Sequence, residues 1–286
     1  MEFTALLQSN IAVFVVAVSL LSLLVGSFLN VVVHRLPIMM EKEWEAQCKP
    51  EEDLPNETYN LAVPRSACPH CGHRITAIEN IPIISYLFLR GKCSNCGTKI
   101  SARYPIVEFI TALLSALVAW KFGFSWETLA ALVFTWCLIC LTLIDFDTQL
   151  LPDSITLPLL WLGLLVSLFG FFVELKPAVI GVMAGYLSLW SVYHLFKLVT
   201  GKEGMGFGDF KLLAALGAWL GWQALPTVIF FSALVGAVVG IALIVIRGRD
   251  RNIPIPFGPF LATAGWLTFM LGDDASLFYL NLLGLN

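Results

Sequence analysis

The chain has 286 residues, of which 58% are hydrophobic and only 13% charged, and its formal net charge is −3 at pH 7. This composition is too apolar for a soluble domain of that length, and it predicts an all-α polytopic membrane protein. The net charge says little about partners, because the asymmetry of charge across the membrane matters more than the sum. No nucleic-acid partner is expected.

The first apolar run covers residues 10–34. No basic residue precedes it, and it ends at Asn30 and His34-Arg35, so we interpret it as a retained membrane helix and not as a signal peptide. About eight transmembrane helices are predicted in all, because roughly 20 apolar residues cross a hydrocarbon core of about 30 Å. The other apolar segments are 105–121, 127–145, 155–173, 178–197, 211–224, 227–246 and 257–272.

One hydrophilic insert interrupts this pattern. The chain is therefore divided into a first transmembrane helix (1–35), an insert domain (36–104) and a seven-helix bundle (105–286). Residues 41–60 are acidic and contain two prolines, which predicts a mobile or loosely packed loop. Most lysines and arginines fall on the face that holds the insert, so the positive-inside rule predicts that this face is cytoplasmic.

The insert carries two C-x-x-C pairs about twenty residues apart, the spacing of a structural zinc site made by four thiolates. Two disulfides are the alternative, but a reducing cytosol argues against them. His70 or His73 could also replace one thiolate. The four predicted zinc ligands are Cys68, Cys71, Cys93 and Cys96.

Two aspartates lie at the edges of apolar segments. Asp145 ends one of them, and Asp209 follows Gly206-Phe207-Gly208. An ionisable residue in a membrane helix costs about 2.5–3.5 kcal/mol on insertion scales, so it indicates a function. Two neighbouring carboxylates share a proton and can act as base and acid on one water, which is the chemistry of peptide hydrolysis. From spacing alone, a flexible glycine loop followed by a capping aspartate explains Asp209 equally well.

Other acids lie near Asp145. Residues two apart on a helix point to nearly opposite faces, so only one of Asp145 and Asp147 can face the partner, and spacing does not choose between them. Asp153 follows Pro152 at the start of the next segment, which predicts a helix N-cap.

Two further features share this edge of the predicted bundle. The proline-rich run 254–259 cannot form a regular helix, and it is either a connection or an extended segment that could hold a substrate strand. Glu108 lies just inside the second apolar segment, where it could pair with Arg103 or Lys92 or take part in a second reaction.

Taken together and in order, these motifs resemble those of the type IV prepilin peptidases, which are GxGD-type intramembrane aspartyl proteases with N-methyltransferase activity. The resemblance implies that the first aspartate of D-x-D-x-x-x-L-P-D and the aspartate of G-x-G-D form the catalytic dyad, here Asp145 and Asp209. It also selects Asp145 over Asp147. The matching motifs are Gly26 to Asn30 with Arg35 to Pro37, both cysteine pairs, Glu79 to Pro82, Arg103 to Pro105 with Glu108, Asp145 to Asp153, Gly206 to Lys211, and Pro256 to Pro259.

The resemblance further implies two reactions. The enzyme would cleave the basic leader from type IV prepilins and type II secretion pseudopilins at the cytoplasmic face of the bacterial inner membrane. It would then methylate the new N-terminus with S-adenosylmethionine, and association with the pilus or type II secretion machinery is also implied. No G-x-G-x-x-G motif marks a methyl-donor site, and its weak candidates could equally pack the insert onto the bundle: Asn30, Glu79, Lys92 and Glu108.

Two other classes of function remain open at this stage. A transporter or channel also uses intramembrane acids, although it would hold them near the bilayer midplane. A noncatalytic assembly scaffold with a zinc domain would tolerate the loss of both aspartates.

Overall fold

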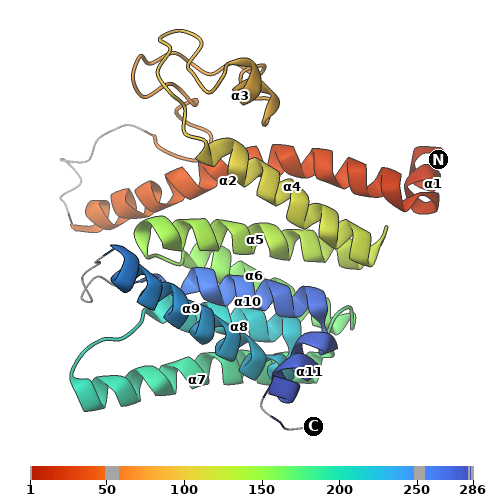
Figure 1. Cartoon of the computed structure of the whole chain (residues 1–286), viewed down its shortest axis with the longest axis vertical. Coiled ribbons are helices and arrows are strands. Elements are labelled where there is room, and N and C mark those ends of the chain that lie inside the picture. The colour runs from red at the N-terminus through yellow and green to blue at the C-terminus, as the bar shows by residue number, and fades with distance from the viewer. Residues whose placement is uncertain (1, 49–57, 248–254, 283, 285–286) are drawn as a thin grey trace. The chain divides into compact units, whose positions relative to one another are not determined.

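The computed structural model describes residues 2–48, 58–247, 255–282 and 284. It divides into two compact units, Met1–Leu132 and Val133–Asn286, and each is described by itself. The described residues contain helices and two isolated β-bridges but no strand (Figure 1).

Each of the eight predicted apolar segments forms a helix. These helices are α2 (Ile11–Cys48), α4 (Arg103–Phe122), α5 (Trp126–Thr148), α6 (Asp153–Leu168), α7 (Leu175–Thr200), α8 (Phe207–Leu220), α9 (Leu225–Arg247) and α10 (Gly258–Leu271). Among the residues that the structure describes, five spans are long and apolar enough to cross a membrane, namely α2, α4, α5, α7 and residues 222–246 around α9. The prediction of a multi-pass, all-α membrane protein is confirmed.

The first helix is longer than the sequence predicted. α2 passes through Pro37, which removes one backbone hydrogen bond, and continues to Cys48. Strong helix formers such as Met, Glu, Lys and Ala after Pro37 sustain it. The predicted loop is therefore wrong over residues 41–48, and residues 49–57 lie outside the described residues.

In the first unit, α2 and α4 pack closely through small and polar side chains. A Cβ on Gly26 would lie only 2.8 Å from the Cα of Glu108, so glycine is needed for this close approach. Ser22, Thr111 and Ser115 are fully buried along the same two helices. Such small-residue contacts are typical of helix packing in membranes, where lipid gives no hydrophobic drive for helices to associate.

The described part of the insert, 58–102, is a set of tight turns with one short helix, α3 (Ile84–Phe88). The guanidinium of Arg35 on α2 donates hydrogen bonds to the carbonyl oxygens of Asn60 at 3.0 Å and of Pro64 at 2.6 Å. This buried arginine ties the start of the insert to α2, and the unit also contains α1 (Glu2–Ser9).

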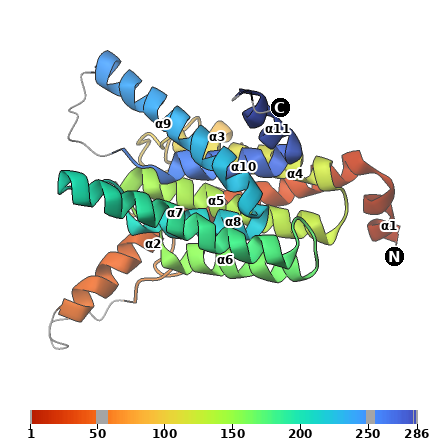
Figure 2. The same cartoon turned by 90° about the horizontal axis from the view of Figure 1, so that it is seen from below.

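In the second unit, α8 forms the centre. Ten of its fourteen residues are buried, and α6, α7, α9 and α10 all contact it. Figure 2 shows α6, α7 and α8 side by side. A Cβ on Gly181 of α7 would lie 2.3 Å from the carbonyl oxygen of Gly217 on α8, so these two backbones touch.

An aromatic core lies at the C-terminal end of α8. The rings of Phe134, Phe172 and Phe269 all pack against Trp219. The Trp219 indole donates a hydrogen bond of 2.9 Å to the Leu159 carbonyl oxygen, which satisfies its only polar atom. The unit is completed by η2 (Trp222–Ala224) and α11 (Asp273–Leu282).

Candidate active site and metal centre

Asp145 lies in the last turn of α5 and is only 5% exposed. The backbone N–H of Gly258, the first residue of α10, donates a hydrogen bond to its carboxylate. Its Oδ2 atom is buried and has no hydrogen-bond partner among the described residues. A Cβ on Gly258 would come within 2.6 Å of that same oxygen, so the absence of a side chain at residue 258 leaves room for the carboxylate.

Asp209 lies in the first turn of α8 and is 7% exposed. The N-terminal end of a helix favours a negative charge, because its first amide groups have no partner within the helix. Asp145 is close enough to act electrostatically on Asp209. The second unit therefore brings together the two aspartates that the sequence singled out, both buried and both at helix ends.

Gly208, next to Asp209, packs closely against Leu151 in the segment that follows Asp145. A Cβ on Gly208 would lie 2.7 Å from the Cβ of Leu151, whereas the nearest atom to a Cβ on Gly206 is 4.0 Å away. Gly206 has φ −82° and ψ 153°, which any residue adopts. Only the second glycine of the Gly206-Phe207-Gly208 segment is therefore required by packing.

The neighbouring acids have other roles. Asp147 lies on α5 and is exposed, as expected for the acid that faces away from the partner. The prediction that Asp153 caps α6 is wrong. Its side chain makes no cap hydrogen bond, and the N-cap residue is Pro152. Both Asp153 carboxylate oxygens instead accept hydrogen bonds from Lys211 Nζ, at 2.8 and 2.7 Å, because the first turns of α6 and α8 meet.

The proline-rich segment leads into α10, whose first residue, Gly258, contacts Asp145. The Phe257 carbonyl accepts hydrogen bonds from Phe260 and Leu261, and the Gly258 amide is bonded to Asp145. The Phe257 carbonyl and the Gly258 amide are therefore already bonded within the protein. Pro254 lies outside the described residues.

The four weak candidates for the methyl-donor site make their contacts in two places. The Asn30 amide donates to the Tyr104 carbonyl at 3.2 Å, and Glu108 accepts a hydrogen bond of 2.8 Å from the Ile83 amide. Asn30 and Glu108 both lie where α2 packs against α4, a contact that we call the α2–α4 seam. Lys92 is exposed on the insert, where it forms a β-bridge with Lys99.

Glu79 is bound within the insert. Its carboxylate accepts hydrogen bonds from the Ser94 hydroxyl and from the amide and hydroxyl of Thr76. These bonds, that from Ser94 above all, hold the pKa of Glu79 at about 2. His73 Nε2 lies 3.2 Å from the same carboxylate. Glu79 thus joins the two cysteine pairs, which is a structural role.

The four cysteine sulfurs of the insert gather within 4.8 Å of one another, and neither His70 nor His73 belongs to the group. The Sγ atoms of Cys68 and Cys96 are 3.9 Å apart, as are those of Cys71 and Cys93. A disulfide needs about 2.05 Å. Four sulfurs at about 2.3 Å from one tetrahedral zinc would instead lie about 3.8 Å apart, so the cluster could hold a metal ion.

Local backbone and charge also suit a metal. Gly72 and Gly97, which follow the two pairs, both have φ +70°, and their amides bond back to the carbonyls of Cys68 and Cys93. Hydrogen bonding with Thr98 lowers the pKa of the Cys96 thiol to about 6. A lower thiol pKa favours the thiolate, which is the form that binds metal.

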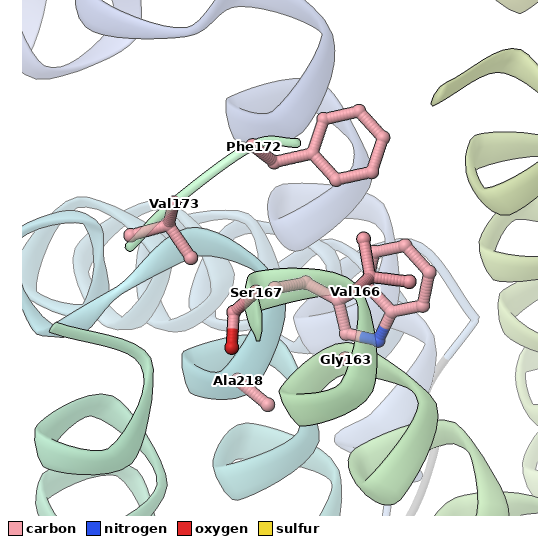
Figure 3. A pocket seen from close by; sticks show the side chains of 7 residues that line it. Gly163, Val166, Ser167, Phe172, Val173 and Ala218 are labelled. Carbon is pink, nitrogen blue, oxygen red and sulfur yellow. The ribbon is translucent and has the colours of Figure 1, made fainter. Parts of the chain in front are cut away.

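The pocket in Figure 3 lies elsewhere. Its lining residues include Ser167, Phe172 and Ala218, and none of them carries a titratable group. Ala218 lies near the C-terminal end of α8, whereas Asp209 lies at its start. This pocket is therefore not part of the aspartate site.

Sequence reasoning missed two contacts of the site. The bond from Gly258 to Asp145 had a signal in Pro256-Phe257-Gly258-Pro259, because a glycine between prolines at a helix start suggests close approach. The ion pair of Asp153 with Lys211 had no local signal, since it joins residues from two separate helices.

Two sequence families match the chain. The family described as "Bacterial Peptidase A24 N-terminal domain" matches residues 20–122, and the "Type IV leader peptidase family" matches residues 132–241. No solved structure matches the chain.

Similar curated proteins carry the name "Prepilin leader peptidase/N-methyltransferase". The protein of that name from Aeromonas hydrophila is 61% identical over 268 residues, which cover 92% of each chain. That from Pseudomonas aeruginosa is 57% identical over 282 residues, 97% of each chain. That from Neisseria gonorrhoeae is 54% identical over 261 residues, 90% of each chain.

Proposed function

Because the chain belongs to the type IV leader peptidase family, we propose that it removes the leader from type IV prepilins and type II secretion pseudopilins and then methylates the new N-terminus. The observation that carries the peptidase proposal is the pair of buried aspartates, Asp145 at the end of α5 and Asp209 at the start of α8. The proposed domains are the first helix (1–35), the insert (36–104) and the protease bundle (105–286).

The two carboxyl groups share one proton in this mechanism. The ionised carboxylate takes a proton from a water molecule, and the resulting hydroxide attacks the carbonyl carbon of the scissile peptide. The protonated carboxyl donates its proton to the carbonyl oxygen. As the tetrahedral intermediate collapses, one of its hydroxyl groups returns a proton to the dyad, the C–N bond breaks, and the amine leaves with a proton from the dyad. The dyad then again holds one shared proton. No covalent enzyme intermediate forms.

The surroundings of the dyad support a mechanism in which one carboxylate acts as base and the other carboxyl acts as acid. The Gly258 amide holds the Asp145 carboxylate in one orientation, while its Oδ2 atom stays available for a water or a shared proton. A transporter would place its acids near the bilayer midplane. Asp145 and Asp209 lie instead in terminal turns of their helices.

The proposed location is the bacterial inner membrane, with the insert and the dyad on the cytoplasmic side. The distribution of lysine and arginine supports this orientation. A prepilin would lie in the same bilayer, with its basic leader in the cytoplasm and its apolar segment among lipids. Membrane lipid and the pilus or type II secretion machinery are further proposed partners.

Two cofactors are proposed. Structural zinc would be held by Cys68, Cys71, Cys93 and Cys96, whose sulfurs have the separations that such a site needs. S-adenosylmethionine would supply the methyl group. We place methyl transfer on the insert and the α2–α4 seam, with Asn30, Lys92 and Glu108 as the weak candidate residues and Glu79 as a structural support.

A direct assay tests both activities. Purified protein is incubated with a full-length prepilin, with and without S-adenosylmethionine, and the product is analysed by mass spectrometry. We expect loss of the leader in both reactions, and an added methyl group on the new N-terminus only when the methyl donor is present. Intact prepilin after prolonged incubation would contradict the proposal.

The two activities should separate. Asp145→Asn should fail to methylate full-length prepilin, because no free amine forms, yet it should methylate a pre-cleaved pilin at close to the normal rate. The measurement is methyl transfer to both substrates by the same folded preparation. Loss of methylation on the pre-cleaved pilin would show that the two sites overlap.

The two glycines before Asp209 should differ in their tolerance to alanine. Gly208→Ala should lower the cleavage rate by about fivefold or more, since overpacking costs about 1–3 kcal/mol and displaces Leu151 or Asp209. Gly206→Ala is the matched control and should cleave at nearly the normal rate, because a Cβ fits there. Cleavage assays on both purified variants decide the matter, and equal losses would contradict this geometry.

A further inference from the structure

The short helix α3 of the insert carries an apolar face that the protein leaves exposed. Ile84, Leu87 and Phe88 are 53%, 67% and 85% exposed. They are spaced i, i+3 and i+4, so they share one face of the helix. Exposed apolar patches of this kind mark sites where a protein meets another apolar surface.

The opposite face of α3 is fixed within the insert. Pro82 just before the helix is buried, and Tyr86 is partly buried. The Tyr86 hydroxyl lies so close to Gly91 that a Cβ there would be 2.8 Å from it. The helix therefore cannot rotate to bury its exposed face without breaking these contacts.

A hydrogen bond sets the depth of α3 relative to the membrane helices of the same unit. The Ile83 amide, one residue before α3, donates to the Glu108 carboxylate at 2.8 Å. Glu108 is five residues into α4, which corresponds to about 7.5 Å from Arg103 along the helix axis. In Figure 1, α3 is drawn above the first turns of α4, to one side of α2 and α4.

The length of α4 is close to the minimum that a helix needs to cross the hydrocarbon core. Its 20 residues span about 30 Å, the thickness of a hydrocarbon core. The start of α4 must then lie close to the bilayer surface, with Glu108 below it. Because Ile83 is bonded to Glu108, the exposed face of α3 begins at the level where headgroups meet acyl chains.

The charge of residues 58–102, the part of the insert that carries α3, fits such a surface. Residues 58–102 contain five exposed cationic side chains and a single acid, Glu79, which is bound internally. Two of the five, Arg90 and Lys92, directly follow α3. Cationic residues next to an apolar face favour anionic lipid headgroups. The five are Arg65, Arg74, Arg90, Lys92 and Lys99.

We propose that α3 is a membrane-surface anchor, which inserts Ile84, Leu87 and Phe88 into the interface of an anionic bilayer and thereby ties the insert to the membrane surface. This contact is separate from leader cleavage and from methyl transfer. It requires only the insert, α2, α4 and lipid.

Photo-crosslinking tests the contact. The full chain, reconstituted in nanodiscs of phosphatidylethanolamine and phosphatidylglycerol, carries a photoreactive phenylalanine analogue in place of Phe88 or, as control, of His70, an exposed residue between Cys68 and Cys71. We expect lipid adducts at position 88 severalfold above those at position 70. Adducts at position 88 to peptides of this chain, or to added prepilin in place of lipid, would overturn the proposal, and so would equal lipid labelling at both positions.

A charge substitution gives a second readout. Phe88→Glu should increase tryptic cleavage after Arg90 and Lys92 severalfold in the same nanodiscs, while the metal content stays unchanged. Phe88→Trp should keep the normal protection, since tryptophan also favours the interface. Unchanged cleavage of Phe88→Glu, with the variant folded and metal-loaded, would overturn the proposal.

Discussion

Asp145→Asn and Asp209→Asn should each abolish leader cleavage while the protein still inserts and accumulates. Asparagine keeps the volume of the side chain but cannot exchange a proton with water at neutral pH. General acid and base catalysis commonly contributes about 10²–10⁴-fold each, so either variant should fall by at least that factor. The measurement is the rate of leader removal from purified prepilin in detergent or nanodiscs.

Asp147→Asn is the matched control for Asp145→Asn. Asp147 lies on the same helix but is exposed, so this variant should keep substantial activity. Asp153→Asn should also keep activity, since both carboxylate oxygens of Asp153 are bonded to Lys211 Nζ. Near-normal cleavage by purified Asp145→Asn or Asp209→Asn would rule out the aspartyl mechanism.

Replacing Cys68 or Cys93 by serine should remove most of the bound zinc and loosen the insert. Wild-type protein should contain about one zinc per chain, as expected for one tetrahedral thiolate site. Structural zinc contributes on the order of 10–16 kcal/mol of apparent binding free energy in small domains. The loss should appear in metal analysis and as faster proteolysis between residues 60 and 100.

Cys48→Ser provides the control, because Cys48 lies on α2 outside the cluster. This variant should keep its zinc and its resistance to proteolysis. Freshly purified, reduced wild-type protein without zinc would contradict the metal assignment, whatever the effect of the serine variants on folding.

Local pattern was enough to predict most of the fold. Long apolar runs fix where membrane helices form, because backbone amides in lipid must be satisfied within a helix. The exception is the region after Pro37, whose polar composition predicts a loop over residues 41–60 although α2 continues to Cys48. Polarity alone does not prevent a helix, and the helix formers after Pro37 carry α2 to Cys48.

The sequence predicts the main side chains of the site but not the contacts that orient them. The cysteine spacing and the two acids at segment edges identify side chains whose chemistry is costly to bury, so they stand out without a structure. The orientation of Asp145 depends on Gly258, and Asp153 depends on Lys211. Such contacts form when distant helices pack, and no local pattern encodes the pairing.

The shortness of α8 has a consequence for the lipid around the protein. Its 14 residues measure about 21 Å, against about 30 Å for an average hydrocarbon core. Its neighbours α6 and α10 are also short, with 16 and 14 residues. Since α8 is covered by other helices, lipid meets the exposed apolar side chains of α6 and α10 instead, and mismatch there is relieved by local thinning of the bilayer. Such thinning would bring bulk solvent nearer to the start of α8, where a hydrolytic reaction could obtain its water without a channel through the protein.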